Sequence, residues 1–362
     1  MFDLNLLKNE ELAVYKLRSL YKSYGYLPFK MSKFEDYDLY ARNKDFLVSD
    51  RVITFNDTDG RLLALKPDVT LSIIKNTKGI STDKQKVYYN ENVYRVSGST
   101  GQFKELMQTG IECIGNIDIT DLYEVVLLAV QSLATVSSEY VLDISHMGII
   151  GAAISDATSD KSLKKHLMQL IAEKNSHEIG ELCRINGISD DKASVLVAIS
   201  GMYGERKSVL SSLSSICPNS ASAALCELRE LDALLTESGI GDRVRFDFSV
   251  VNNMKYYNGI VFKGFLEGIC EGVLSGGEYA NLLESMRISS RGIGFALYLD
   301  LLCELDDGAD EYDVDVLLLY SSSTKPADLA SRKAELINSG KSVYSSLSVP
   351  ERLTYREKIV LN

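Results

Sequence analysis

A carboxylate and a hydroxyl group lie two residues apart where a predicted strand turns into a predicted helix. Pro67 opens that helix, Asp68 stands in its first turn, and Thr70 comes two residues later. Both side chains could face one cavity, in which Asp68 would pair with a ligand ammonium group and Thr70 would form a hydrogen bond. An acidic first turn that complements the helix dipole explains the same residues without a ligand.

A second group of polar residues alternates along a predicted strand. Gln108, Gly110 and Glu112 are spaced by two, so their side chains share one face of the strand. Arg95, on the preceding predicted strand, could supply a cation for a carboxylate or phosphate group in the same cavity. If buried, the glutamine and the glutamate need partners, which a ligand ammonium or imidazole group would provide. An exposed polar strand face is the alternative.

Two adjacent tyrosines, Tyr256 and Tyr257, precede a predicted strand. Their rings and hydroxyl groups could surround a flat, polar ligand, or they could pack at the strand end without one. Paired glycines follow in the segments 275–279 and 292–296, where they allow the backbone to approach a ligand closely or mark plain turns. Neither the P-loop pattern nor the dinucleotide-binding glycine pattern occurs in the sequence.

These candidate residues need a scaffold of strands with a few helices. Apolar residues at helical spacing predict a helix over 7–24, which Gly25 ends. An Asp-Gly turn joins two hairpin strands, 52–55 and 61–65, ahead of the Asp68 segment. Further strands are predicted at 86–96, 106–114, 141–146, 244–250, 259–265 and 273–274, with a helix over 120–133 that Thr120 caps and an apolar helix over 295–305.

The sequence pattern divides the chain into four parts. Between 148 and 241, Leu, Ala and Ser dominate and strand signals almost vanish, which predicts a helical insertion. Its helices are predicted at 151–154 (barely one turn), 163–174, 179–185, 189–198 and 221–238. The insertion divides the core into two parts, 1–147 and 242–305. A linker and a small α/β unit follow at 306–362. The predicted fold class is α+β, with an antiparallel sheet flanked by helices.

The composition of the chain excludes several classes of partner. Its 362 residues carry a net charge of −11, which disfavours a nucleic-acid partner because phosphates are also negative. We expect no transmembrane helix, since no run of about 18 apolar residues is evident, and no secretion signal at the N-terminus. Six scattered cysteines without a C-x-x-C pair, and only three histidines, predict a reduced cytoplasmic protein without a metal site.

Taken in order, these segments resemble the catalytic domain of histidyl-tRNA synthetase, a class II synthetase fold, over about residues 7–305. The segment 252–257 (NNMKYY) is similar to the family's R-G-L-D-Y-Y, and 294–301 (GFALYLDL) is similar to G-F-A-x-G-x-E-R. The resemblance implies an amino-acid pocket formed by Asp68, Thr70, Gln108, Glu112, Tyr256 and Tyr257. Arg95 matches the arginine of the family's second motif.

The chain departs from the family where the resemblance places ATP. Asn252 replaces the arginine that helps to form the adenylate, and Leu301 replaces the arginine that holds ATP. Tyr298 stands in place of a small glycine of the adenine region, Gln102 in place of a loop arginine, and Val96 in place of a glutamate. Each lost charge-assisted contact to a developing phosphate charge costs on the order of 3 kcal/mol, so adenylate formation is not expected.

This combination resembles the inactive synthetase paralogue that serves as regulatory subunit of ATP phosphoribosyltransferase, the first enzyme of histidine biosynthesis. The resemblance implies a homodimeric core, a short-form catalytic subunit as partner, and transmission of histidine feedback inhibition. It implies histidine as a possible ligand. It implies no catalytic residue and no cofactor in this chain. Two alternatives remain: an active adenylate-forming enzyme, and a free-standing amino-acid sensor.

Overall fold

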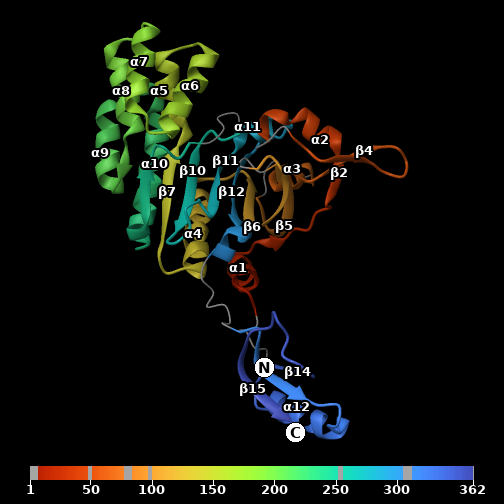
Figure 1. The fold of residues 1–362 in the computed structure, drawn as a ribbon. Helices are drawn as coiled ribbons and strands as arrows, with labels where there is room; N and C mark the ends of the chain where they lie inside the picture. The colour runs from red at the N-terminus through yellow and green to blue at the C-terminus, as the bar shows by residue number, and fades with distance from the viewer. Residues whose placement is uncertain are drawn as a thin grey trace. The chain divides into compact units, whose positions relative to one another are not determined.

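The computed structural model describes residues 7–47, 51–76, 84–96, 100–251, 256–304 and 312–361. The chain forms two compact units, Met1–Leu305 and Asp306–Asn362 (Figure 1). All seven candidate ligand-binding residues belong to the first unit.

A nine-stranded sheet runs through the first unit (Figure 1). Neighbouring strands are antiparallel except at two contacts, β1 with β5 and β7 with β9. In spatial order the strands are β1 (Leu27–Pro28), β5 (Gln85–Val96), β6 (Phe103–Gly115), β12 (Arg291–Tyr298), β11 (Leu274–Glu278), β10 (Ile260–Leu266), β7 (Tyr140–His146), β9 (Val244–Asp247) and β8 (Tyr203–Gly204). The predicted α+β class, with a mainly antiparallel sheet flanked by helices, is confirmed.

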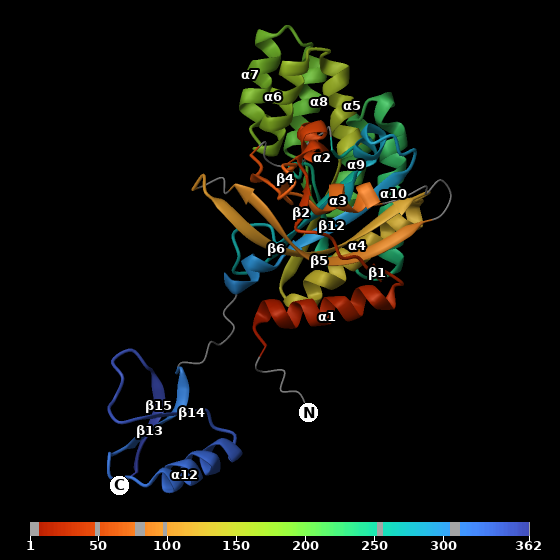
Figure 2. The same cartoon turned by 90° about the vertical axis from the view of Figure 1, so that its right-hand side faces the viewer.

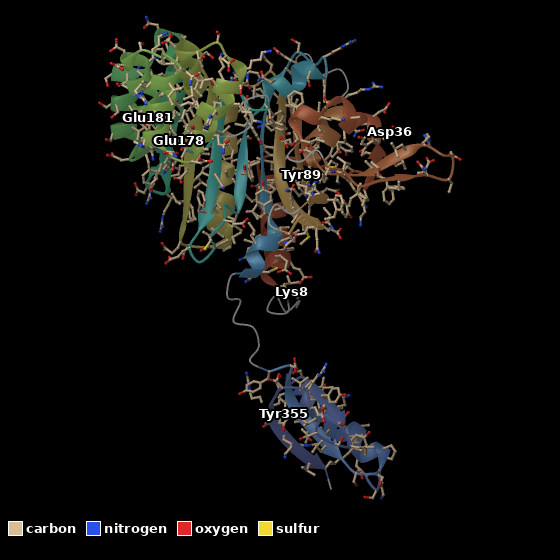
Figure 3. The ribbon with its side chains drawn as sticks, turned by 45° about the horizontal axis from the view of Figure 1, so that its top comes forward. Lys8, Asp36, Tyr89, Glu178, Glu181 and Tyr355 are labelled. Carbon is tan, nitrogen blue, oxygen red and sulfur yellow. The ribbon has the colours of Figure 1, made fainter. Side chains whose placement is uncertain are left out.

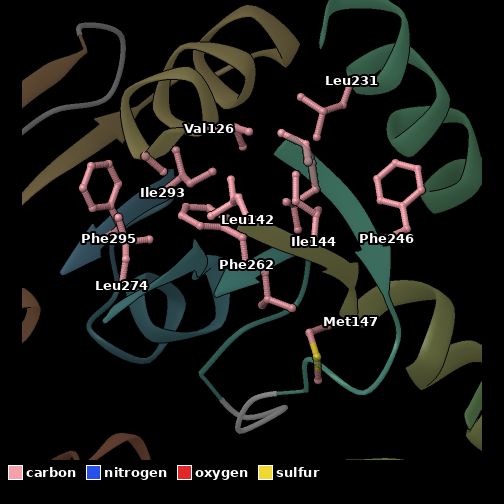
Figure 4. Close-up of a cluster of buried hydrophobic side chains, with 14 of the residues drawn as sticks. Val126, Leu142, Ile144, Met147, Leu231, Phe246, Phe262, Leu274, Ile293 and Phe295 are labelled. Atoms are coloured by element: carbon pink, nitrogen blue, oxygen red, sulfur yellow. The ribbon is translucent and has the colours of Figure 1, made fainter. Parts of the chain in front are cut away.

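Three helices, α1 (Asn9–Ser23), α4 (Ile119–Val136) and α10 (Ser222–Glu237), pack in the larger core on one face of the sheet. Their apolar side chains merge with those of the strands, and Figure 4 shows part of this cluster. Phe262 on β10 and Phe295 on β12 are buried there, with ring centroids 6.3 Å apart. This core holds the sheet against its helices.

The opposite face of the sheet carries a smaller core. It includes residues of α2 (Tyr37–Arg42), α3 (Val69–Asn76), α11 (Ala280–Ser285) and β4 (Leu62–Leu65), the middle strand of a three-stranded antiparallel sheet with β2 (Phe34–Asp36) and β3 (Thr54–Asn56). Strand β5 serves both cores because its side chains alternate: Val87 and Tyr89 join the smaller core, and Tyr88 joins the larger one.

Six helices form the insertion between β7 and β9, and Figure 2 shows them gathered at one end of the sheet. They are α5 (Met147–Ala157), α6 (Lys161–Ala172), α7 (Ser176–Ile185), α8 (Asp190–Ser200), α9 (Arg206–Ile216) and α10, with short 3-10 turns η3 (Asn219–Ala221) and η4 (Gly241–Arg243). Figure 3 labels Glu178 and Glu181, two exposed side chains of α7.

Several element predictions are wrong. The apolar segment predicted as a helix over 295–305 is instead strand β12 followed by the 3-10 helix η5 (Leu299–Glu304). β12 lies at the centre of the sheet and is mostly buried, so its run of apolar and small residues shows no polar alternation. Helix α9 forms where no helix was predicted, α5 is longer than one turn, and Asp118 rather than Thr120 caps α4.

Helix α4 also corrects the expectation that no apolar run of about 18 residues exists. By length and composition it meets the requirement for a membrane-spanning helix, the one that does so among the described residues. Half of it is buried, and Leu122, Val126 and Leu133 belong to the large core against the sheet. Its apolar character therefore has an explanation in packing, since α1, α10 and four strands of the sheet surround it.

The second unit is a small parallel sheet with one helix. Strands β13 (Val314–Tyr320), β14 (Val343–Ser346) and β15 (Tyr355–Leu361) pair in the order β14-β13-β15, and α12 (Pro326–Asn338) connects the first two. Val316, Leu318 and Leu336 form its buried core.

Phe262→Ala should reduce the free energy of unfolding by about 3–5 kcal/mol, because the ring is fully buried in the larger core. Urea unfolding followed by far-UV circular dichroism measures this loss. Phe262→Leu, which keeps most of the apolar volume, is the matched control and should cost clearly less. A loss below about 1 kcal/mol for the alanine variant would contradict the assigned burial.

Candidate functional site

A cavity of ≈ 420 Å³ opens on the sheet face that carries the smaller core. Its floor comes from β5, β6, β11 and β12, and its wall from the start of α3 and the tyrosines before β10. All seven residues predicted as ligand-binding line it: Asp68, Thr70, Arg95, Gln108, Glu112, Tyr256 and Tyr257. The sequence places these residues up to 189 positions apart, from 68 to 257, and the fold brings them together.

Glu112 lies at the centre of the hydrogen bonding in this cavity. One carboxyl oxygen accepts a hydrogen bond from Thr70 Oγ1 at 2.7 Å, and the other accepts one from the Tyr279 hydroxyl group. Burial raises the pKa of Glu112 to about 8, although the two donors work in the opposite direction. At neutral pH this carboxyl group is therefore largely protonated, and a ligand cation would convert it to a carboxylate.

Asp68 and Arg95 form a second polar pair beside Glu112. The Asp68 Oδ1 atom caps α3 by accepting the Leu71 N–H at 2.8 Å, and Oδ2 lies 3.7 Å from the Arg95 guanidinium group. Arg95 Nε also donates to the backbone carbonyl oxygen of Pro67 at 2.8 Å. Burial raises the pKa of the Asp68 carboxyl group, and Arg95 counteracts part of that rise. Asp68 therefore supports the helix and also lines the cavity, while its pairing with a ligand ammonium group stays a prediction.

Gln108 is the polar group of this site that lacks a partner. Its side chain is 2% exposed, and Nε2 has no hydrogen-bond partner among the described residues. A buried amide without a partner costs about 1–3 kcal/mol, so an acceptor on a ligand would relieve that cost. The exposed polar strand face considered for Gln108 and Glu112 is wrong, because both side chains are buried.

Small residues keep the floor of the cavity open. A Cβ atom at Gly294 would lie 2.0 Å from Glu112 Oε2, because the two residues are paired across β12 and β6. A Cβ atom at Gly110 would lie 2.0 Å from the carbonyl oxygen of Phe295. These two glycines permit close packing within the protein, and the approach of the backbone to a ligand stays a prediction.

Aromatic rings form one wall of the cavity. The ring centroid of Tyr256 lies 4.5 Å from that of Tyr257, 5.9 Å from that of Tyr279 and 6.4 Å from that of Phe46. Burial raises the pKa of Tyr256, Tyr257 and Tyr279 well above the ordinary value, so their hydroxyl groups stay protonated and can donate.

The structure adds site residues that the sequence analysis did not single out. Tyr279 and Ser275 line the cavity from the glycine-rich segment, and Tyr89 lines it from β5 (labelled in Figure 3), donating its hydroxyl hydrogen to Phe295 O at 3.3 Å. The alternation of β5, with Tyr89 and Arg95 both at odd positions and so on one face, is the signal that could have identified Tyr89.

The positions that depart from the synthetase pattern lie in different surroundings. Tyr298 lines the cavity, whereas Leu301 lies in η5 and packs against the larger core. Gln102 is exposed beside the start of β6. Asn252 lies outside the described residues. Among the described residues that line the cavity, Arg95 is the only cation, and it already contacts Asp68 and Pro67.

Comparison with known sequences decides the family. The sequence model described as histidyl-tRNA synthetase matches residues 5–302.

The chain belongs to the histidyl-tRNA synthetase family.

Within the histidyl-tRNA synthetase family, the chain is similar to curated proteins named ATP phosphoribosyltransferase regulatory subunit. The protein from Clostridium kluyveri is 29% identical over 316 residues, which cover 84% of this chain and 81% of that protein. Those from Oceanobacillus iheyensis and Clostridium acetobutylicum are each 26% identical, covering 86% and 91% of this chain and 78% and 84% of their own lengths.

Solved structures show the same fold. A protein described as an ATP phosphoribosyltransferase regulatory subunit/histidyl-tRNA synthetase from Bacillus halodurans has a TM-score of 0.75 at 22% identity, covering 99% of this chain and 96% of that one. A chain of the ATP phosphoribosyl transferase (HisG:HisZ) complex from Thermotoga maritima has a TM-score of 0.63 at 22% identity, covering 80% and 97%. The class II synthetase fold expected for residues 7–305 is confirmed.

Replacing Glu112 by Gln should change how stability depends on pH. The unfolded chain loses the Glu112 proton near 4.5, but the folded chain keeps it until about 8. Between these values the folded state binds more protons, so the stability of the unmodified protein falls as pH rises, by up to about 1.4 kcal/mol per pH unit from this group. A glutamine at this position has no proton to lose, so the Glu112→Gln variant lacks this decline.

Urea unfolding of both proteins at pH 5, 7 and 9 measures the effect. The stability of the variant relative to the unmodified protein should increase from pH 5 to pH 7 and level off above about pH 8, where both the folded and the unfolded chain have lost the Glu112 proton. A difference that stays constant with pH would contradict the buried, protonated state assigned to Glu112.

Proposed function

We propose that this chain is a non-catalytic, cytoplasmic regulatory subunit of ATP phosphoribosyltransferase. In this role it activates a short-form catalytic subunit and makes that subunit sensitive to histidine, the end product of the pathway. Support comes from the name shared by the curated relatives, which match 84–91% of this chain. The Thermotoga maritima assembly, in which a chain of the same fold is part of an ATP phosphoribosyl transferase complex, also favours this role.

The polar lining of the cavity carries the proposal. The carboxyl groups of Asp68 and Glu112 face one guanidinium group, that of Arg95, among the described lining residues, and a ligand cation would favour the charged form of Glu112. Such a site suits an ammonium or imidazolium group, which can pair with a carboxylate. It does not suit a nucleotide, because adenylate formation needs several cations or metal ions to neutralise the phosphates in the transition state.

The proposed ligand is histidine, bound within this cavity. Its ammonium group would lie near Asp68 and Thr70, and its imidazole ring near Glu112 and against the ring of Tyr257. The ligand would also supply the acceptor that the Gln108 amide lacks among the described residues. These assignments combine the family resemblance with the hydrogen bonds and burial described above.

The proposed partners are a short-form ATP phosphoribosyltransferase subunit and a second copy of this chain. Mixing the purified chain with a short-form catalytic subunit should raise its phosphoribosyltransferase activity and make that activity sensitive to histidine. Steady-state rates with and without histidine test both effects. If both rates stay unchanged, the regulatory role is contradicted. Histidine-dependent ATP–pyrophosphate exchange by the chain alone would instead favour an adenylate-forming enzyme.

Calorimetric titration with histidine and with ATP tests the ligand site separately. Histidine should bind, and ATP should not bind measurably. Asp68→Asn retains an oxygen that can accept the Leu71 N–H but loses the charge, so it should weaken histidine binding by roughly 10-fold or more.

Glu178→Gln is the matched control for this titration, because Glu178 is an exposed carboxylate on α7 of the insertion. It should leave the histidine affinity unchanged. Tight ATP binding to the unmodified chain, or equal histidine affinity in the Asp68→Asn variant, would contradict the proposed site.

A further inference from the structure

We propose that Lys66 and Glu91 are positioning residues for the cavity: their buried ion pair fixes the turn between β4 and α3 on strand β5, and thereby sets where Asp68 and Thr70 meet a ligand. Neither residue lines the cavity. The inference rests on the proposed ligand site for its affinity measurement, and it does not depend on the regulatory role.

Lys66 and Glu91 form a largely buried ion pair. Lys66 Nζ lies 2.8 Å from Glu91 Oε2, and the Lys66 side chain is completely buried while that of Glu91 is 13% exposed. The other carboxyl oxygen of Glu91 accepts the backbone N–H of Met31 at 3.3 Å. Burial lowers the pKa of Lys66, and contact with Glu91 counteracts that shift. Glu91 is the one carboxylate in direct contact with the ammonium group, and the charge of Glu35 adds to its effect.

The two residues belong to two of the segments that supply polar groups to the cavity. Lys66 directly precedes Pro67 and Asp68, at the end of β4 and ahead of α3. Glu91 lies on β5 between two cavity-lining residues, Tyr89 and Arg95. The ion pair therefore links the carboxylate-bearing turn directly to the strand that bears the cavity cation.

Two further hydrogen bonds join the same turn to the same strand. The Tyr94 N–H donates to the Lys66 carbonyl oxygen at 2.9 Å, and Arg95 Nε donates to the Pro67 carbonyl oxygen at 2.8 Å. Both of these involve backbone carbonyl groups of the turn, whereas the Lys66–Glu91 contact joins two side chains. Together the three contacts leave the turn little freedom to shift along β5.

A role in positioning accounts for the burial of this pair better than a role in stability. Removing two charges from water costs several kcal/mol, which their attraction recovers only in part, and apolar replacements are often equally stable. What a buried pair supplies over an apolar contact is direction, because the ammonium hydrogens must meet the carboxylate oxygens at short range. A site that orients a carboxylate and a hydroxyl toward a ligand needs its supporting residues held in this way.

Lys66→Met, Glu91→Gln and the double variant test the inference. Each single change should weaken L-histidine binding about tenfold by calorimetry, and the double variant should weaken it no more than either single one, since both remove the same ion pair. Lys66→Arg, which retains the charge, should recover part of the affinity. Arg206→Met is the control: Arg206 forms a largely enclosed pair with Asp232 at 2.6 Å within the insertion, away from the cavity, and also donates to the carbonyl oxygens of Gly241 and Val244.

The control separates positioning from general stability. Arg206→Met should lower the melting temperature at least as much as Lys66→Met does, because it also loses hydrogen bonds to backbone carbonyl groups, but it should leave the histidine affinity within about twofold of the unmodified chain. Unchanged affinity in a folded Lys66→Met or Glu91→Gln variant would overturn the inference. So would an equal loss of affinity in Arg206→Met.

Amide hydrogen exchange gives a readout that does not need the ligand. Loss of the pair should speed exchange in the segment 67–72 of Lys66→Met and Glu91→Gln, relative to helix α6 in the same proteins. If the unmodified chain does not bind histidine, the proposed ligand fails, and exchange alone decides the positioning role. Unaltered exchange in 67–72 would overturn it.

Discussion

A carboxyl group held inside the protein, that of Glu112, is the constraint on which the cavity depends. Its two oxygens are occupied by hydroxyl donors from different elements, Thr70 at the start of α3 and Tyr279 just after β11. On the adjacent strand β12, Gly294 must lack a side chain for this carboxyl group to fit. A buried acid is costly unless donors surround it, so α3, β6, β11 and β12 must keep one relative arrangement for the protein to fold.

The same arrangement fits the proposed role, in which a synthetase fold retains a ligand site without adenylate chemistry. The groups proposed to recognise an amino acid lie on strands and on the first turn of α3, and their hydrogen bonds also support the fold. Cations that would neutralise a triphosphate have no such second role. At the Leu301 position a leucine instead packs against the core, which is favourable for folding.

Much of the architecture was predictable from local patterns. The strand–turn–strand hairpin ahead of Asp68, the long strands β5 and β6, and the helical insertion after β7 follow from turn residues, alternation and composition. β12 was not predictable in this way, because a central strand buried on both faces shows the contiguous apolar residues that also mark a buried helix. The apolar composition of α4 has the same cause, burial among other helices and strands.

The sequence alone determined the family resemblance, the residue types that can recognise an amino acid, and the missing phosphate cations at Asn252 and Leu301, because these depend on which residue occupies which position. Only the tertiary structure decided which groups are buried and paired. It showed that Gln108 lacks a partner among the described residues, that Tyr279 completes the hydrogen bonding of Glu112, and that Lys66 is enclosed with Glu91. The physical reason is that desolvation and hydrogen-bond geometry depend on neighbours distant in the chain, which local patterns do not record.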